Sequence, residues 1–258
     1  MLHCSSGETS VPIGVSSALL VSLLLVLSGC TTVSSRDTRP GLDAESIRKV
    51  IESPIRTDQD RRMDASRRPA ELLTLMQVGP GMRVLDVSAG GGYTSQLLAL
   101  AVGSTGMVWA QREQPGAALS KRLNDQPQPN LAVALRPYEN PVPAEAPQLD
   151  LVTLILNYHD ITYQPVDRAK MNQRIFDALK PGGHYVLIDH AAKAGADISS
   201  GKSLHRIDPA IVITEAQRAG FMVEAQSDAW RDPSDTREGS SGDSRNPSDK
   251  FALRFVKP

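Results

Sequence analysis

One segment of the sequence joins a carboxylate to a cluster of glycines. Asp86 is followed by Ser88 and Ala89, then by three successive glycines at 90–92 and by Tyr93. Glycine lets the backbone adopt a positive φ and lets a ligand approach without meeting a Cβ atom. If a helix begins at Tyr93, its amide N–H groups face that ligand as well. We therefore expect a ligand to bind here, although a tight turn alone would use the same glycines.

A second polar group follows an apolar run at 149–156, where Asn157, Tyr158, His159 and Asp160 stand in succession. His159 is a candidate general base, with Asp160 orienting its ring. Alternatively, Asp160 caps the next segment and His159 only binds the backbone. The separations of the histidines match no local metal-binding motif, so a catalytic metal is the less favoured interpretation. Further candidates of the same kinds are Asp189, His190, His205 and Arg206.

These groups need a sheet to bring them together, and the apolar periodicity predicts one. Apolar residues at helical spacing predict helices at 69–76, 93–100, 117–123, 167–179 and 208–218. Short apolar runs predict strands at 83–87, 106–111, 131–135, 149–156 and 185–188, and an antiparallel pair at 221–225 and 251–256. Alternating helices and strands indicate an α/β fold with a mainly parallel sheet. In such folds ligands bind beyond the carboxyl ends of the strands.

The order of these motifs resembles class I S-adenosylmethionine-dependent methyltransferases. The resemblance covers about residues 65–258 and is closest to a poorly characterised bacterial group of predicted methyltransferases. The residues that carry it are 86–92, the Leu-Lys-Pro-Gly-Gly at 179–183, Arg-Arg-Pro at 67–69, Tyr-His-Asp at 158–160 and the ending at 251–258. The resemblance implies a Rossmann-like, doubly wound, seven-stranded sheet with its last strand antiparallel and helices on both faces. It also implies S-adenosylmethionine as cofactor and an unidentified methyl acceptor of small or medium size.

The resemblance also assigns roles to residues. Asp86 would anchor the cofactor near its methionine end, and Asn157 would lie beside the sulfonium. Ser88 stands where the family has its first glycine, and Gln111 replaces the acid that grips the ribose hydroxyls. A neutral glutamine gives weaker hydrogen bonds than a carboxylate. The predicted catalytic residues are Tyr158, His159 and Asp160, and the predicted cofactor-binding residues are Asp86, Ser88, Ala89, Gly90, Gly92, Tyr93, Gln111 and Asn157.

The N-terminal segment is typical of an export signal. The apolar run at 15–27 is shorter than the roughly 20 residues that cross a bilayer, and it fits the core of a signal peptide. Leu27-Ser28-Gly29-Cys30 then resembles the lipobox of bacterial lipoproteins, whose cysteine is acylated after cleavage. We therefore predict a signal peptide at 1–29, a flexible tether at 30–42 and the methyltransferase-like domain at 43–258.

This division predicts a cell-envelope lipoprotein that faces the periplasm and contacts the membrane through lipidated Cys30. Thr31, rather than aspartate, follows the cysteine and favours the outer membrane. The only other cysteine is Cys4, so the domain has no disulfide and no thiol nucleophile.

Charge gives no reason to expect nucleic acid as a partner, because the formal net charge is −1. A local cluster of arginines at 61, 62, 67 and 68 alternates with acids at 58, 60 and 64 and indicates a solvated helix face. The polar segment at 232–249 is expected to be an exposed, mobile loop.

Two alternatives remain open. A periplasmic domain has no expected supply of S-adenosylmethionine, and Ser88 and Gln111 depart from the family pattern. A non-catalytic, envelope-anchored binding protein that reuses the fold would fit these facts. A nicotinamide-dependent oxidoreductase is less favoured, because Ser95 stands where G-x-G-x-x-G/A requires its last glycine or alanine.

Overall fold

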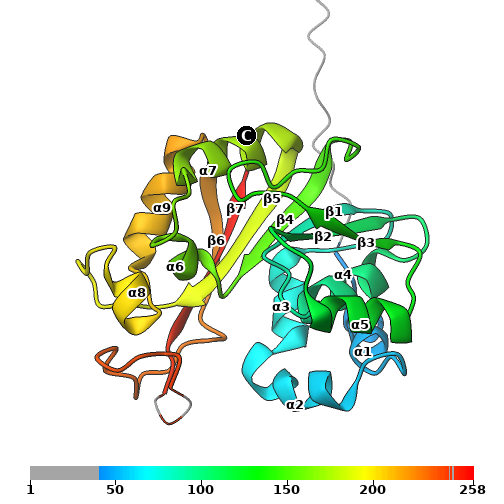
Figure 1. Ribbon diagram of the computed structural model, residues 1–258. Coiled ribbons are helices and arrows are strands. Elements are labelled where there is room, and N and C mark those ends of the chain that lie inside the picture. The colour runs from blue at the N-terminus through cyan, green and yellow to red at the C-terminus, as the bar shows by residue number, and fades with distance from the viewer. Residues whose placement is uncertain (1–40, 244, 246) are drawn as a thin grey trace, which may run out of the picture. The chain divides into compact units, whose positions relative to one another are not determined.

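The computed structural model describes residues 41–243, 245 and 247–258, so the predicted signal peptide and Cys30 lie outside the described residues. These residues form a seven-stranded sheet with helices packed on both faces (Figure 1). The strands are β1 (Arg83–Val87), β2 (Met107–Arg112), β3 (Leu131–Leu135), β4 (Leu149–Ile155), β5 (Leu179–His190), β6 (Met222–Ser227) and β7 (Lys250–Val256). The helices are α1 (Ala44–Ile51), α2 (Asp58–Arg67), α3 (Pro69–Met76), α4 (Tyr93–Val102), α5 (Ala117–Asp125), α6 (Tyr158–Ile161), α7 (Arg168–Ala178), α8 (Ser200–Leu204) and α9 (Pro209–Arg218). In this part of the chain no helix has the length and apolar character to span a membrane.

The strand order is β3-β2-β1-β4-β5-β7-β6. The first five strands are parallel, and β7 runs antiparallel to both β5 and β6. This confirms the predicted doubly wound sheet and its antiparallel last strand. The chain leaves β1 toward one edge and later returns to form β4 on the other side, so β1 and β4 are neighbours at the switch point where such sheets bind ligands.

Side chains of each central strand alternate between two apolar cores. Val84 of β1 packs with α1, α3 and α4, whereas the next residue, Leu85, packs with α7 and α9 on the opposite face. Burial on both faces explains why the sequence of β4 is almost continuously apolar. Trp109 of β2 is buried in the second core.

Capping residues fix where several helices begin. Asp167 accepts a hydrogen bond from the amide of Lys170, the third residue of α7, and Asp208 accepts one from the amide of Ala210, the second residue of α9 after Pro209. Thr57 and Asp60 form a reciprocal capping box at the start of α2. These local signals place the helix starts within a residue or so of the predicted ones for α7 and α9.

The Leu-Lys-Pro-Gly-Gly segment at 179–183 belongs to β5, whereas the sequence predicted a helix to residue 179 and a strand only at 185–188. β5 already begins at Leu179, and its pairing with β4 shifts register between Leu149 and Leu151. The amide of Gly182 donates to the carbonyl of Lys257, so the C-terminal segment pairs with this bulged part of β5. The bulge interrupts the pairing of β5 with β4 after Leu179, and the pairing resumes at His184.

The described residues of the predicted loop at 232–249 are exposed or half-buried apart from Asp249, but buried ion pairs anchor the segment at several points. Arg206 is fully buried and forms an ion pair with Asp235 of the loop at 2.8 Å. Its guanidinium also donates to the carbonyls of Gly239 and Pro247. Asp249 is 1% exposed and accepts hydrogen bonds from Arg231 and Arg237. Buried ion pairs therefore hold a segment whose composition alone is typical of a solvated loop.

Candidate active site

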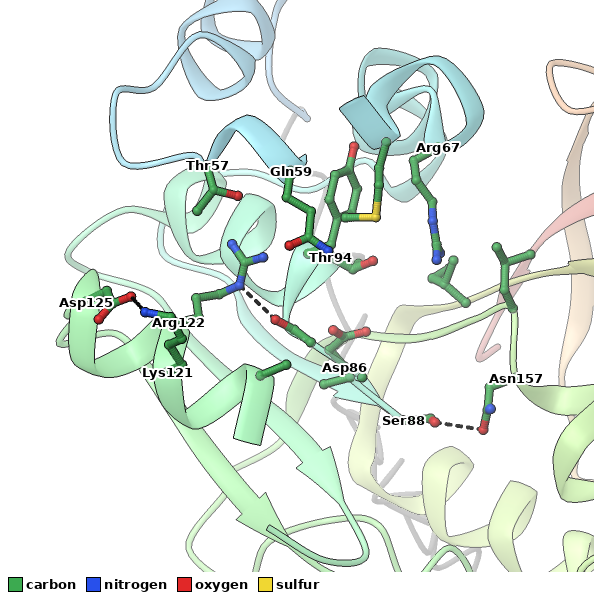
Figure 2. A pocket seen from close by; sticks show the side chains of 18 residues that line it. Thr57, Gln59, Arg67, Asp86, Ser88, Thr94, Lys121, Arg122, Asp125 and Asn157 are labelled. Carbon is green, nitrogen blue, oxygen red and sulfur yellow. Dashed lines mark hydrogen bonds and ion pairs between the residues drawn. The ribbon is translucent and has the colours of Figure 1, made fainter. Parts of the chain in front are cut away.

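A pocket of about 480 Å³ lies at the carboxyl ends of β1 and β4 (Figure 2). This is within the range of small-molecule sites in proteins. Its walls come from the glycine-rich turn, the end of β4, the first turn of α4, one side of α5 along its length, and α2. The lining residues are Thr57, Gln59, Met63, Arg67, Asp86, Ser88, Ala89, Gly90, Gly91, Tyr93, Thr94, Ala118, Lys121, Arg122, Asp125, Ile155, Leu156 and Asn157.

Asp86 is a carboxylate held at the floor of this pocket. Its side chain is 2% exposed and accepts hydrogen bonds from Ser95 Oγ at 2.5 Å and Thr153 Oγ1 at 2.7 Å. Burial raises the pKa of Asp86 to about 6, although these hydrogen bonds and the charge of Arg67 act in the opposite direction. A bound cation would favour the ionised form, so the site is matched to a positively charged group.

The predicted glycines adopt the backbone conformations that glycine favours. Gly90 has a φ of 56° and Gly92 a φ of 82°. A Cβ on Gly92 would lie 2.7 Å from Leu119 Cδ1, so α4 and α5 approach each other closely here. The turn therefore needs glycine at position 92 for two independent reasons, φ and packing.

Ser88 occupies the first glycine position of the family pattern with a φ of 58°, which is unfavourable for a side chain. Hydrogen bonds hold it there. Its amide donates to Gln111 Oε1 at 2.8 Å, and its hydroxyl donates to Asn157 Oδ1 at 2.7 Å. Leu156, at the end of the neighbouring strand, also has a positive φ of 57°. Strained backbone at both strand ends is the kind of feature that clusters at functional sites.

Gln111 lies under the turn and does not line the pocket. Its side chain is fully buried, and its Nε2 donates to the carbonyl of Arg136 at 2.6 Å while its Oε1 accepts from Ser88. Both the oxygen and the nitrogen of the Gln111 side-chain amide are therefore hydrogen-bonded to backbone groups of the protein. A ligand's hydroxyls would need other partners, and Gln111 supports the turn that holds Ser88.

Arg67 is a pocket residue that the sequence analysis did not propose as a ligand-binding residue, although it belongs to the Arg-Arg-Pro motif at 67–69. It belongs to α2, and its guanidinium lies 5.9 Å from the ring centroid of Tyr93. Burial lowers the pKa of Arg67, while the charges of Tyr93 and Asp86 oppose that shift. Among the described residues no hydrogen bond or ion pair engages this side chain. A half-buried cation without a carboxylate partner is suited to an anionic group of a ligand.

Helix α2 covers the pocket and is held by ion pairs on either side of it. The expected solvated helix face holds for Asp58, which is exposed, and is wrong for Asp60 and Asp64. Asp60 is 1% exposed and pairs with Arg122 of α5 at 2.6 Å, and Arg122 also donates to the carbonyl of Gly91. Burial opposes ionisation of Asp60, but hydrogen bonds from Arg122 and Thr57 lower its pKa to about 2. Asp64 accepts from Tyr93. The sequence showed the charges of α2 but not their partners, which lie far along the chain.

The three predicted catalytic residues do not point the same way. Tyr158 is buried in the core on the α7 and α9 side, where its hydroxyl donates to Glu215 at 2.5 Å and accepts from Asn172 at 2.8 Å. Its hydroxyl is thus turned away from His159 and Asp160, and the structure does not bring it to the pocket. Asp160 is linked to the pocket by Asn157, whose Nδ2 donates to Asp160 Oδ2 at 3.1 Å.

His159 is oriented by a different carboxylate from the one that the sequence suggested. Asp189, at the end of β5, is fully buried and accepts from His159 Nδ1 at 2.6 Å and from its backbone amide at 2.8 Å. Asp160 Oδ1 lies on the other side of the ring, 3.2 Å from Nε2. Burial acts to lower the pKa of His159, but Asp189 and Asp160 raise it above its ordinary value. Two secondary candidates, Asp189 and His205, therefore join the group around His159.

Comparisons with known proteins agree with this geometry. A family profile described as protein-L-isoaspartate(D-aspartate) O-methyltransferase matches residues 46–147, which is less than half of the chain. No curated protein sequence matches the chain. A structure of a SAM-dependent methyltransferase from Aquifex aeolicus is similar at a TM-score of 0.58 and 18% identity, covering 84% of this chain and 100% of that one.

Two further solved structures are similar over three quarters of the chain. A putative sarcosine dimethylglycine methyltransferase from Galdieria sulphuraria has a TM-score of 0.54 and 16% identity, covering 77% of this chain and 85% of that one. The O-methyltransferase NcsB1 from neocarzinostatin biosynthesis was solved in complex with S-adenosyl-L-homocysteine and 1,4-dihydroxy-2-naphthoic acid. It has a TM-score of 0.51 and 15% identity, covering 78% of this chain and 56% of that one. The chain therefore has the Rossmann-like fold of the class I methyltransferases.

Proposed function

We propose that the protein is an S-adenosylmethionine-dependent methyltransferase. The observation that carries the proposal is the pair of opposite charges in the pocket at the switch point of a methyltransferase fold. Asp86 is suited to a cation and Arg67 to an anion. The methionine end of S-adenosylmethionine carries both, as an ammonium and a carboxylate. When bound, this cofactor supplies an electrophilic methyl group on its sulfonium.

The chain's own residues fit the cofactor in three respects. The left-handed turn at Gly90 and Gly92 lets backbone approach the ligand, and helix α2 covers the pocket. Asn157 lies at the end of β4, next to the glycine-rich turn, and leads to His159 and Asp160. We therefore assign the glycine-rich side to the cofactor and the side beyond Asn157 to the methyl acceptor.

The family match supports the cofactor and not an isoaspartate acceptor. Residues 46–147 include β1, the glycine-rich turn and β2, which form the cofactor half of the domain. The group around His159 and Asp189 lies outside the matched segment. We propose an acceptor of small or medium size that carries a nucleophilic oxygen or nitrogen, because a histidine held by a buried carboxylate faces the acceptor side.

Calorimetric titration of the purified protein with S-adenosylmethionine and S-adenosylhomocysteine tests the proposal. We expect micromolar binding of both, lost in Asp86→Ala and weakened at least about tenfold in Arg67→Met, because a charge-assisted hydrogen bond contributes about 1.5–3 kcal/mol. Arg68→Met is the matched control, since Arg68 is exposed and, within the described part of the chain, its side chain has one ion pair, with Glu71 at 3.5 Å.

Failure of a folded protein to bind either compound would refute the methyltransferase proposal. Binding of NAD or NADP in their place would support the oxidoreductase alternative. Binding of neither class of cofactor would support the alternative of a non-catalytic, envelope-anchored binding protein. A thermal-shift screen with the same compounds gives an independent readout, because a ligand that binds the native state raises its apparent stability.

We further propose that the chain is a periplasm-facing lipoprotein anchored through Cys30. The proposal is supported by the apolar run at 15–27 and by Leu27-Ser28-Gly29-Cys30. In bacterial cells, labelled palmitate should enter the wild-type chain but not Cys30→Ser. Cys4→Ser is the control, because its cysteine precedes the apolar run. Equal labelling of wild type and Cys30→Ser would refute the anchor.

A further inference from the structure

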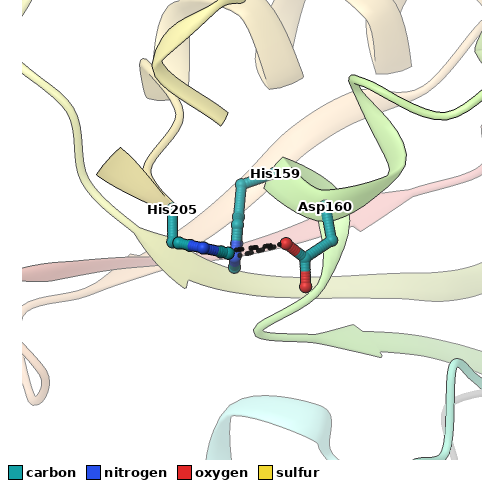
Figure 3. A group of neighbouring side chains, drawn as sticks. All are labelled: His159, Asp160 and His205. Carbon is teal, nitrogen blue, oxygen red and sulfur yellow. Dashed lines mark hydrogen bonds and ion pairs between the residues drawn. The ribbon is translucent and has the colours of Figure 1, made fainter. Parts of the chain in front are cut away.

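A cluster of three possible metal ligands lies beside the pocket, formed by His159, Asp160 and His205 (Figure 3). Each side chain contributes one ligand atom, a ring nitrogen from each histidine and a carboxylate oxygen from Asp160, and these atoms lie within 4.8 Å of one another. His159 and Asp160 lie on α6, and His205 lies just after α8, 45 residues beyond Asp160. We propose that these three side chains bind a divalent transition-metal ion such as Zn²⁺. Its open coordination position would receive an oxygen of the methyl acceptor.

Hydrogen bonding around His159 provides the first argument. Asp189 accepts from Nδ1 at 2.6 Å, so in the neutral ring Nδ1 carries the proton and Nε2 carries a lone pair. That lone pair faces the carboxylate oxygen Oδ1 of Asp160 at 3.2 Å. Two electron-rich atoms in this arrangement repel each other unless a proton or a metal cation lies between them. A ligating histidine whose other nitrogen is held by a carboxylate is a recurrent feature of zinc sites.

Distances around Asp160 provide the second argument. His159 Nε2 lies 3.2 Å and His205 Nδ1 lies 3.1 Å from the same oxygen, Oδ1. Ligands of a tetrahedral zinc ion at about 2.0–2.2 Å are separated from one another by about 3.3–3.6 Å. These two separations are a few tenths of an ångström shorter, and the two nitrogens lie within 4.8 Å of each other, so rotamer adjustments of the three side chains would admit the ion. Tyr163 also donates to Oδ1 at 2.7 Å, and Asn157 donates to Oδ2, so Asp160 is already fixed in place.

Exposure indicates an open site and not a closed structural one. His159 is buried, whereas the side chains of Asp160 and His205 are 27% and 44% exposed. Three protein ligands with a fourth position open to solvent are the arrangement of catalytic zinc sites. His190, the other histidine next to His159, is an unsuitable ligand through Nδ1, because that atom is bonded to Ser248.

The position of the site relative to the pocket defines the role of the metal, and this part of the inference rests on the proposed function. Asn157 contacts both Ser88 in the pocket and Asp160 in the cluster. An oxygen bound to the metal would therefore lie on the acceptor side of the pocket. A divalent cation polarises such an oxygen and lowers the pKa of its hydroxyl, so the site favours alcohols, phenols and carboxylates as acceptors over amines.

Titration of untagged, metal-stripped protein with Zn²⁺ at pH 8 tests the site, with calorimetry for affinity and visible absorption of the Co²⁺ form for coordination number. We expect one ion per chain with four-coordinate Co²⁺. Affinity should fall by more than 100-fold in Asp160→Asn and in His205→Ala, since both remove a direct ligand. Asp189→Asn should lose about 10–100-fold, as is usual for a partner that orients a ligating histidine. His184→Ala is the matched control, because His184 forms a histidine–carboxylate pair with Glu224 outside this cluster.

Absence of Zn²⁺ and Co²⁺ binding to the wild type, or equal affinity in wild type, Asp160→Asn and His205→Ala, would overturn the proposal. Because Asp160 and His205 are partly exposed, their variants should fold, and S-adenosylhomocysteine binding checks that they do. The same titration separates the two proposals. Cofactor binding without metal binding would refute only the metal site, and metal binding without cofactor binding would refute only the proposed methyltransferase activity.

Discussion

Replacing Asp86 with asparagine should abolish cofactor binding and yet stabilise the empty protein. Burial raises the pKa of Asp86 from an ordinary 3.8 to about 6, so ionisation at pH 7 costs the folded state about 3 kcal/mol at 1.36 kcal/mol per pKa unit. Asparagine removes this charge and still accepts one hydrogen bond from Ser95 or Thr153, and the hydroxyl that loses its acceptor costs about 1 kcal/mol. We therefore expect Asp86→Asn to raise the free energy of unfolding by about 1–3 kcal/mol at pH 7.

The pH dependence provides a sharper test than the sign alone. The folded state binds the proton more tightly than the unfolded state, so wild-type stability decreases as the pH rises from about 4 through about 6. The advantage of Asp86→Asn over wild type should shrink as the pH falls, and it should vanish near pH 4. Urea unfolding at pH 4, 5, 6 and 7 without ligand measures it.

Asp60→Asn is the matched control, because it is a buried carboxylate whose pKa is lowered to about 2 instead of raised. It should therefore destabilise the protein at pH 7. A loss of stability in Asp86→Asn at pH 7, or an advantage that does not change between pH 7 and pH 4, would refute the reasoning about Asp86.

Three further changes test the parts that surround the site. Arg122→Met leaves Asp60 buried and unpaired, so the free energy of unfolding in urea should fall by about 3–5 kcal/mol; an unchanged midpoint would show that α2 is not held by this pair. Gly92→Ala places a methyl group against α5 at a positive φ, and calorimetry should show at least about tenfold weaker binding of S-adenosylhomocysteine, because distortion of about 1.4 kcal/mol already has that effect. Arg206→Met removes the buried partner of Asp235 and should speed limited proteolysis within 232–249, whereas an unchanged cleavage rate would mean that the loop does not depend on Arg206.

Local patterns in the sequence were sufficient for the class of fold and for the approximate positions of the seven strands. The apolar run of β4, the glycine-rich turn after β1 and the caps of α7 and α9 each express a constraint that operates within about ten residues. Such constraints are readable without knowing what packs against them. The alternation of these elements then predicted an α/β fold with a mainly parallel sheet, and the doubly wound order with an antiparallel last strand followed from the resemblance to the methyltransferases.

Side-chain direction within a motif was not readable in the same way. Tyr158 and His159 are neighbours in the sequence, but α6 turns one into the apolar core and the other toward Asp160. Gln111 lies one residue before the end of β2, and its side chain points under the turn, where it accepts a hydrogen bond from the amide of Ser88. Rotation about a short helix or a strand end decides such directions, and the surrounding packing sets that rotation.

By itself, the sequence determined the class of fold, the cofactor-side turn and the position of Asp86, because each depends on residues that are close together in the chain. The tertiary structure alone decided which distant residues complete the site. It placed Arg67 over the pocket, paired His159 with Asp189 and brought His205 to Asp160. These pairings depend on where β4, β5 and the segment after α8 meet at one edge of the sheet. Burial of apolar surface in the two cores stabilises this arrangement of strands and helices, so no local pattern in the sequence encodes the pairings.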